Sequence, residues 1–147
     1  MKTDPLAFEL FNEIGIIDQL IGTMLTNALP QGMTKAQFTV LNHFVRLDVA
    51  EKSPADLASA FQVRRPTITS TLARMESAGL VAIRFNPRDG RAKLVSITAA
   101  GRDMRERCIS ALATVIPKIE PAITDAEMRA LLPKLRKLRI GLDMMRE

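Results

Sequence analysis

The chain has 147 residues, of which 47% are apolar and 25% charged, so it can bury a core and does not have the composition of a disordered chain. Its formal net charge is +5, and no apolar run approaches the roughly 20 residues that cross a bilayer. The single Cys108 excludes an internal disulfide. Asp4 and Pro5 interrupt the stretch where a secretory signal would be apolar, so we expect one cytoplasmic domain over residues 1–147.

The first predicted element is a helix over residues 5–29. Pro5 suits a first helical position, and Pro30 and Gly32 end the pattern. Apolar residues recur every three or four positions, at Leu6, Leu10, Ile14, Ile17, Ile21, Met24 and Leu25. This spacing predicts a helix with one apolar face.

Two shorter helices are predicted next. Thr34 and Gln37 have the spacing of a capping box, which predicts a helix to about position 47. Ser53 before a proline predicts the start of a third helix, over 54–61. The inward side chains of this pair are predicted to be Phe38, Leu41, Phe44, Val45, Leu57, Ala58 and Phe61.

A further helix must begin near Arg65. Pro66 can start a helix but cannot lie deep inside one, so the third and fourth helices are joined by a turn of only a few residues. The predicted buried stripe of the fourth helix is Ile68, Leu72 and Met75. Gly79 is expected to end it.

Residues 81–85 and 93–97 alternate between apolar and other side chains, around a turn rich in Pro, Asp and Gly. Two alternating runs around such a turn predict a β-hairpin. Its inward side chains are predicted to be Val81, Ile83, Phe85, Val95 and Ile97. We expect no other strand in the chain.

From Thr98 onward the sequence predicts helices. Thr98 is expected to cap a helix over 98–119, with Pro117 and Pro121 limiting or bending its end. Thr124 and Glu127 form a second capping-box pattern and open a final helix. Its coiled-coil-like seam is Met128, Leu131, Leu135, Leu138, Leu142 and Met145, and Pro133 predicts a kink.

The positive charge is concentrated in one quarter of the chain. Residues 61–97 hold seven Lys and Arg against two acidic residues, whereas the remainder holds 14 of each kind. A local surplus of this kind suits a polyanion, and nucleic acid is the commonest one. A solvated basic face without a partner is the alternative.

The predicted order of short helix, tight turn, helix and hairpin is that of a winged helix-turn-helix, here over residues 34–97. A helix fits the major groove of DNA, and its exposed side should carry cations and short hydrogen-bonding groups. The candidates on the fourth helix are Thr67, Ser70, Thr71 and Arg74, with Thr69 near the boundary and Arg64 and Arg65 at the entrance.

The hairpin supplies a second set of candidates. Arg91 is expected to enter the minor groove, where negative potential is concentrated. Arg84, Arg88 and Lys93 are expected to contact phosphates beside it. Asp89, next to Gly90 in the turn, is expected to accept turn amides or to pair with an arginine, and so to shape the wing.

Residues 62–101 resemble the core of MarR-type transcriptional regulators. The resemblance is carried by Asp89-x-Arg91, by Ile97-Thr98-x-x-Gly101 and by Met75-Glu76-x-x-Gly79-Leu80. The outer helices match the family only in arrangement. Many members carry a basic residue at the position of Ser70, so the base preference is expected to differ.

The resemblance implies a regulator, acting as a repressor, that binds double-stranded DNA as a homodimer on a palindromic operator. It implies pairing through residues 5–29 and 98–146. The interface candidates are Leu6, Leu10, Ile14, Ile17, Leu131, Leu135, Leu138 and Leu142. Packing of these seams on each other within a monomer is the alternative. The resemblance also implies a small anionic or aromatic effector, bound between the dimerisation helices and the winged part, that releases DNA.

Other chemistry finds little support in the sequence. His43 and Cys108 are expected to be core or interface residues, and one histidine with one cysteine does not make a metal site. No phosphate-binding glycine loop or nucleophile–base pattern is present in the sequence, so we expect no enzyme and no cofactor. A winged helix that docks proteins is the alternative function. Its wing should be apolar or mixed, whereas this wing is cationic.

Overall fold

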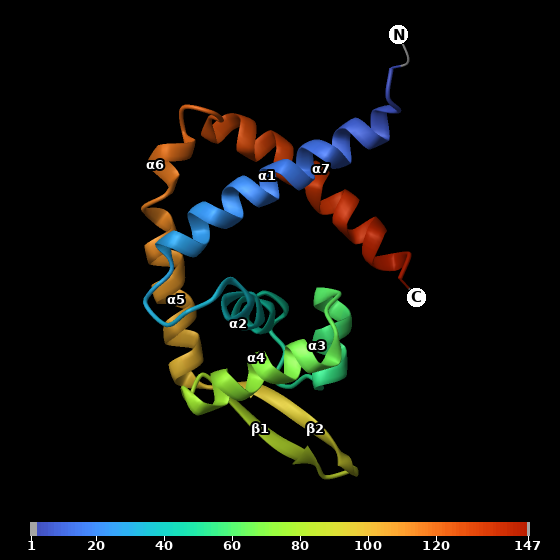
Figure 1. The fold of residues 1–147 in the computed structure, drawn as a ribbon, viewed down its shortest axis with the longest axis vertical. Helices are drawn as coiled ribbons and strands as arrows, with labels where there is room; N and C mark the ends of the chain where they lie inside the picture. The colour runs from blue at the N-terminus through green and yellow to red at the C-terminus, as the bar shows by residue number, and fades with distance from the viewer. Residues whose placement is uncertain (1–2, 147) are drawn as a thin grey trace. The chain divides into compact units, whose positions relative to one another are not determined.

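The computed structural model describes residues 3–146. Its elements in chain order are α1 (Leu6–Ala28), α2 (Lys35–Leu47), α3 (Pro54–Phe61), α4 (Arg65–Ser77), β1 (Val81–Asn86), β2 (Asp89–Ile97), α5 (Ala99–Ala113), α6 (Ile116–Ile119) and α7 (Asp125–Met144), as drawn in Figure 1. The chain forms two compact units, one ending at Ala113 and one beginning at Thr114. The predicted fold class, mostly helical with one antiparallel hairpin, is confirmed.

The predicted helix starts are present because their side chains satisfy free backbone amides. Thr34 Oγ1 accepts the Gln37 amide at 3.1 Å while Gln37 Oε1 accepts the Thr34 amide at 3.3 Å. Thr124 and Glu127 repeat this reciprocal pair at the start of α7. Ser53 Oγ accepts the Asp56 amide at 3.1 Å and begins α3. Each such cap contributes about 1 kcal/mol to stability.

The core of the first unit lies among α2, α3 and α4 and is closed by the hairpin. Its fully buried side chains are Val40, Leu41, Phe44, Leu57, Leu72, Met75, Val95 and Cys108. Burying each large apolar side chain contributes roughly 1.5–3 kcal/mol. The predicted stripe of α4 is confirmed, because Ile68, Leu72 and Met75 are all buried.

Two left-handed residues set the limits of α4. Gln62 ends α3 with φ 53°, and α4 starts at Arg65, so the two helices are joined by a very short turn. Gly79, with φ 74°, follows the C-cap of α4, and the Leu80 amide then donates to the Met75 carbonyl at 2.9 Å. Glycine adopts this φ without a steric penalty. The chain therefore turns at once into β1.

The joint between α4, the hairpin and α5 is unusually tight. Thr98 Oγ1 donates to the Gly79 carbonyl at 2.6 Å and accepts the Gly101 amide at 3.0 Å. A Cβ at position 101 would collide with the Leu80 carbonyl and lie 2.8 Å from Ile97 Cγ1. Only glycine fits this close approach, which gives a physical reason for the Ile97-Thr98-x-x-Gly101 pattern.

The hairpin differs from its prediction in three respects. β2 begins at Asp89 rather than Lys93, so the turn consists only of residues 87 and 88. The strand register breaks between Phe85 and Asn86. A backbone bridge joins Lys52 to Val95, so an additional extended residue lies beside β2. The prediction missed this bridge because a single extended residue produces no alternating pattern.

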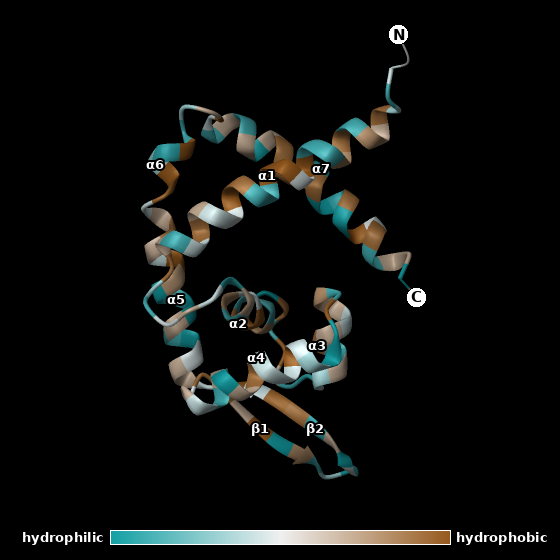
Figure 2. Cartoon of the chain, viewed as in Figure 1, coloured by the Kyte–Doolittle hydropathy of each residue, from teal (hydrophilic) through white to brown (hydrophobic). Residues whose placement is uncertain are grey.

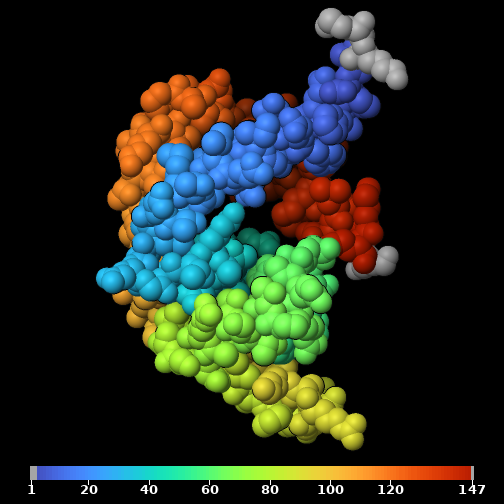
Figure 3. All heavy atoms as spheres, in the orientation of Figure 1, coloured from blue at the N-terminus to red at the C-terminus, as the bar shows by residue number. Residues whose placement is uncertain are grey.

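The predicted inward position of Phe85 is wrong. Its side chain is 65% exposed, whereas Val81 and Val95 of the same hairpin are buried. The hairpin (yellow) projects past the helices of its unit in Figure 3. Alternation fixes the side of the strand on which a residue lies, but burial also requires an element above that position.

The helices of the C-terminal part also depart from expectation. The predicted helix over 98–119 is divided, because α5 ends at Ala113 and α6 is a separate helix with Pro117 in its first turn. α7 extends on both sides of Pro133, and the kink at this residue stays a prediction. Within residues 3–146, no helix is both long and apolar enough to cross a membrane.

Candidate nucleic-acid interface

The outer side of α4 carries the polar residues that the sequence assigned to it. Opposite the buried stripe, the exposed side chains are Arg64, Arg65, Thr67, Thr69, Ser70 and Arg74, and Thr71 is half-buried. Short hydroxyl side chains and arginine are groups that can contact base edges and phosphates. The helix therefore presents a polar, cationic ridge on a rigid core.

The arginines at the start of α4 oppose the helix dipole. Arg64 is the N-cap residue and makes no side-chain cap, and Arg65 is the first helical residue. Cations at a helix N-terminus are unfavourable by about 0.3–1 kcal/mol, because that end is partially positive. An approaching phosphate removes this conflict, since it is attracted both by the guanidinium groups and by the helix end.

At the tip of the wing, the polar side chains of the turn bond to backbone amides and form no ion pairs with the neighbouring cations. Asn86 Oδ1 accepts the Arg88 amide at 3.0 Å, and Asp89 Oδ1 accepts the Arg91 amide at 3.1 Å. The acidic group of the turn is thus bonded to backbone. The side chains of Arg88, Arg91 and Lys93 are exposed and make no ion pair with any residue between 3 and 146. Figure 2 shows the hairpin tip as hydrophilic.

Arg84 lies apart from this cationic tip. Its Nε and Nη2 donate to the two carboxylate oxygens of Glu51 at 2.7 and 2.9 Å. Glu51 precedes Lys52, whose backbone bonds to Val95. Arg84 was expected to contact a phosphate, and this stays a prediction, since its side chain is 52% exposed. We propose that the bidentate ion pair also gives Arg84 a structural role, in which it ties the wing to the loop before α3.

A groove of about 430 Å³ runs between α4 and the wing. Arg65 and Thr69 line it from the helix, whereas Ile83, Arg91 and Lys93 line it from the hairpin. At Glu76, Oε2 accepts the Ile83 amide at 3.2 Å, so this acid is tied to the hairpin backbone. Both walls carry cations, so the groove suits an anionic strand better than a neutral ligand.

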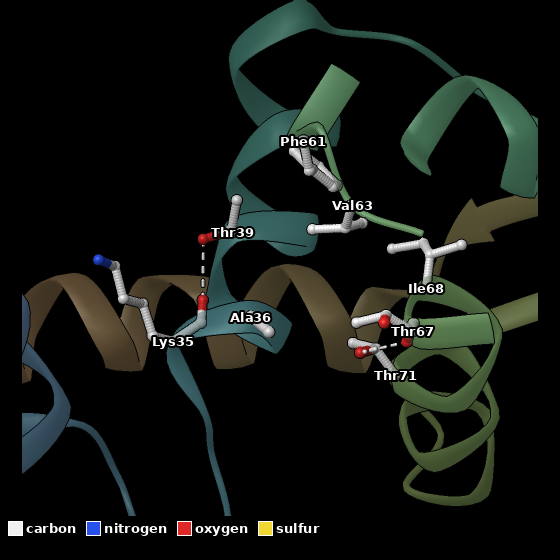
Figure 4. Close-up of a pocket in the computed structure, with 8 residues that line it drawn as sticks. All are labelled: Lys35, Ala36, Thr39, Phe61, Val63, Thr67, Ile68 and Thr71. Carbon is white, nitrogen blue, oxygen red and sulfur yellow. Dashed lines mark hydrogen bonds between the residues drawn. The ribbon is translucent and has the colours of Figure 1, made fainter. Parts of the chain in front are cut away.

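A second groove, of about 500 Å³, lies between the start of α2 and the other flank of α4 (Figure 4). Thr39 and Thr71 stand on its two sides, and their hydroxyls donate to carbonyls of their own helices at 2.8 and 3.0 Å. With those hydroxyls occupied, the walls are mainly apolar, and they include Phe61, Val63 and Ile68.

Lys35 connects this groove to α1. It lines the groove, and its Nζ lies 3.4 Å from Asp18 Oδ1 on α1. A Cβ at Gly22 would lie 3.1 Å from the same Nζ, so the small residue gives the ammonium room to cross the helix. The pair is exposed and weak, so the ammonium can exchange its partner.

His43 and Cys108 are core residues, as the sequence indicated. Burial lowers the pKa of His43, and the nearby Arg46 and Lys52 lower it further. Its ring meets Phe61 edge-on, with the centroids 5.0 Å apart. Burial raises the pKa of the Cys108 thiol, which disfavours the reactive thiolate. Residues 3–146 contain no cluster of three or more metal-ligating side chains.

Together, the α3–turn–α4 pair, the projecting hairpin and the uncompensated cations define a winged helix-turn-helix protein. A model of the MarR family matches residues 31–92, which extend from before α2 to the wing. The chain is also 39% identical over 102 residues to the transcriptional activatory protein BadR of Rhodopseudomonas palustris. That alignment spans 69% of this chain and 57% of BadR.

Solved structures extend the likeness to nearly the whole chain. Wild-type MarR from E. coli in its apo form is 26% identical, with a TM-score of 0.76 over 94% of this chain and 98% of that one. A MarR variant from E. coli in complex with operator DNA is 27% identical, with a TM-score of 0.71 over 92% and 99%. By these comparisons the chain is similar to MarR-family regulators, in sequence over residues 31–92 and in fold over nearly its whole length.

Two features of the site were missed by sequence reasoning. Glu51 stands alone in a loop, and nothing in its neighbourhood predicts that Arg84 would reach it. The residues that line the groove in Figure 4 come from α2, α3, α4 and the turn between α3 and α4. No pattern within one segment of the sequence could therefore predict this groove. The cation at the first position of α2 was a usable signal for Lys35, since a lysine there opposes the helix dipole.

The Glu51–Arg84 pair should give a measurable but small coupling energy. The side chains are 33% and 52% exposed, so solvent screens the pair, and we expect about 0.5–1 kcal/mol from a double-mutant cycle of Glu51→Gln and Arg84→Gln. Urea unfolding at fixed protein concentration measures it. Arg88→Gln is the matched control and should change stability little. Strict additivity of the two substitutions would contradict the structural role of Arg84.

Proposed function

We propose that this protein is a transcriptional regulator that binds double-stranded DNA sequence-specifically. The observation that supports this most is the groove between α4 and the wing, which carries Arg65 on one wall and Arg91 and Lys93 on the other. Glu76 also lines this groove, but three cations against one acid leave a surplus of positive charge that a bound anion would offset. A sugar–phosphate strand is an anion of suitable shape for an open groove.

The proposed docking follows from the two projecting elements. α4 enters the major groove with Thr67, Ser70 and Arg74 towards the bases, and Thr69 and Thr71 flank them. The wing places Arg91 in the adjacent minor groove, and Arg88 and Lys93 contact phosphates. The backbone strand between the two DNA grooves then lies in the cationic groove of the protein.

We further propose that the protein acts as a homodimer on a palindromic operator. α1 leaves much of its apolar stripe in water, with Leu6, Leu10 and Ile17 exposed by 81%, 48% and 55%, and Ile14 half-buried. α7 contains no buried residue and exposes Leu131, Leu135 and Leu142, with Leu138 half-buried. A twofold partner that covers both surfaces would present two recognition helices, which matches an inverted repeat in DNA.

Repression is the proposed direction of regulation. A dimer that covers a promoter blocks transcription sterically and needs no contact with the polymerase. BadR is named as an activatory protein, so the opposite direction is a real alternative. A reporter gene placed behind the bound site separates the two, because deletion of the regulator raises expression under repression and lowers it under activation.

A small anionic or aromatic effector is proposed as the signal that releases DNA. The groove between α2 and α4 supports this proposal, because its apolar walls suit a ring and Lys35 at its edge suits a carboxylate. Thr67 and Thr71 line the same groove, so a bound ligand would lie against the recognition helix. Binding to this site and binding to DNA would then exclude each other.

Substitution Arg91→Ala tests the DNA-binding proposal. On a duplex selected from random sequences, we expect affinity to fall by about 10-fold or more, because one cation per subunit leaves the DNA. Fluorescence anisotropy between 50 and 200 mM salt, about the range over which such contacts dominate, should also show a shallower salt dependence. Arg102→Ala is the matched control, since this exposed arginine lies on α5. Equal effects of the two variants would contradict the wing assignment.

Substitution Leu10→Glu tests the dimer. A buried charge in an apolar interface is strongly unfavourable, so the variant should sediment as a monomer at about 10 µM, where the wild type should be a dimer. Asn12→Glu adds the same charge on the far side of α1 and should stay dimeric. A wild-type monomer at that concentration, or a dimeric Leu10→Glu protein, would rule out this interface.

Lys35→Met tests the effector site, because methionine keeps the apolar stem and removes the charge. Calorimetry with benzoate as the aromatic probe, and acetate as the non-aromatic control, measures the binding. Here the wild type should bind benzoate and not acetate, and the variant should bind benzoate about 10-fold or more weakly than the wild type, the scale of a lost charge-assisted hydrogen bond. Undiminished binding to the variant would place the site elsewhere.

A further inference from the structure

Phe85 is an exposed aromatic residue on the cationic hairpin. Its side chain is 65% exposed, although the strand alternation places it on the same side as buried Val81 and half-buried Ile83. A phenyl ring left in water forgoes the stabilisation that burial would give. The fold alone therefore gives no reason for a phenylalanine at this position.

The hairpin is held in place by contacts that do not involve this ring. The strands pair through their backbones, Lys52 bridges to Val95, and Glu51 binds Arg84. The aromatic contact found among residues 3–146 joins His43 and Phe61 and does not involve Phe85. Removing the ring should leave the folded wing intact.

The position of Phe85 relates it directly to the cationic groove. It faces Lys93 across the hairpin, and Lys93 and Arg91 both line the groove between α4 and the wing. Ile83 lines that groove two residues earlier on the same strand. Because residues two apart on a strand are separated by about 7 Å, the phenyl ring lies one step further out on the groove side of the hairpin.

We propose that Phe85 is an apolar contact to the minor groove, where its ring packs against deoxyribose edges beside the inserted Arg91. This inference rests on the proposed DNA-binding function. Apolar side chains in the minor groove displace water and can wedge between base steps, which bends the duplex. Lys93, which pairs with Phe85 across the hairpin, and Arg91, two residues earlier on β2, draw the DNA backbone towards the ring, and the ring itself adds no charge.

The proposal predicts a specific kind of sequence preference. Base pairs under the wing would be chosen for the ease with which they unstack or bend, as at pyrimidine–purine steps, rather than for hydrogen bonds to their edges. Phe85 would thus influence specificity at positions outside the reach of α4. Its contribution should also be independent of salt, because an uncharged side chain releases no counterions.

The test compares Phe85→Ala, Phe85→Leu and Arg91→Ala in the full-length protein. The wild type first selects a duplex from random sequences, and anisotropy then gives the affinity and salt dependence of each variant. Energy transfer between dyes at the duplex ends reports bending. Phe85→Ala should lose about 5- to 20-fold in affinity and most of the bend, with the salt dependence of the wild type. Phe85→Leu should keep both within about threefold, because leucine can also act as a wedge.

Each other outcome overturns the inference in an identifiable way. Wild-type affinity and bending in Phe85→Ala would remove the contact but leave the proposed function standing. A shallower salt dependence like that of Arg91→Ala, or a melting temperature lowered by several degrees, would show that the ring acts by positioning the wing. A change in oligomeric state would assign the ring to a protein interface. Absence of DNA binding by the wild type would overturn the proposed function itself.

Discussion

The feature on which the proposed function depends is a set of cations that lack ion pairs within the described chain and lie in the groove between α4 and the wing, where the fold tolerates their repulsion. Arg65 on α4 faces Arg91 and Lys93 across an open groove that Glu76 also lines, and none of these three cations forms an ion pair with an acid of residues 3–146. The repulsion between these cations costs little free energy because the groove is open to water, which screens the charges. The hairpin also stays folded because its strands pair through their backbones. The carboxylates of Asp89 and Glu76 accept hydrogen bonds from backbone amides and form no ion pair with these cations.

The geometry of that surface is set by small residues at some distance from the charges. Gly79 reverses the chain at the end of α4, and Gly101 lets α5 approach the Leu80 carbonyl. Thr98 joins the two through its hydroxyl. The helix and the hairpin are therefore fixed to each other through one joint, and the family pattern around it describes this constraint. The same joint belongs to the unit that ends at Ala113, so the proposed DNA-binding surface lies on one compact unit.

Local chemistry made much of this fold predictable. Capping boxes at Thr34 and Thr124 and the apolar stripe of α4 were visible because each depends on residues three or four apart. The predictions failed for features that depend on contacts between segments distant in the sequence. Glu51 reaches Arg84 across 33 positions, and Phe85 is exposed only because no other element covers the outer hairpin. The cations of the candidate site could thus be predicted from the sequence. The groove between α4 and the wing, and the Glu51–Arg84 ion pair that holds the wing, could not.

We expect the regulator to present two copies of this surface, related by a twofold axis. The most direct measurement is a hydroxyl-radical footprint of the full-length protein on its selected duplex, resolved on both strands. Two protected patches, related by symmetry and each including a minor-groove segment beside the recognised bases, are expected. A single patch without symmetry, or protection without any minor-groove segment, would contradict the central claim.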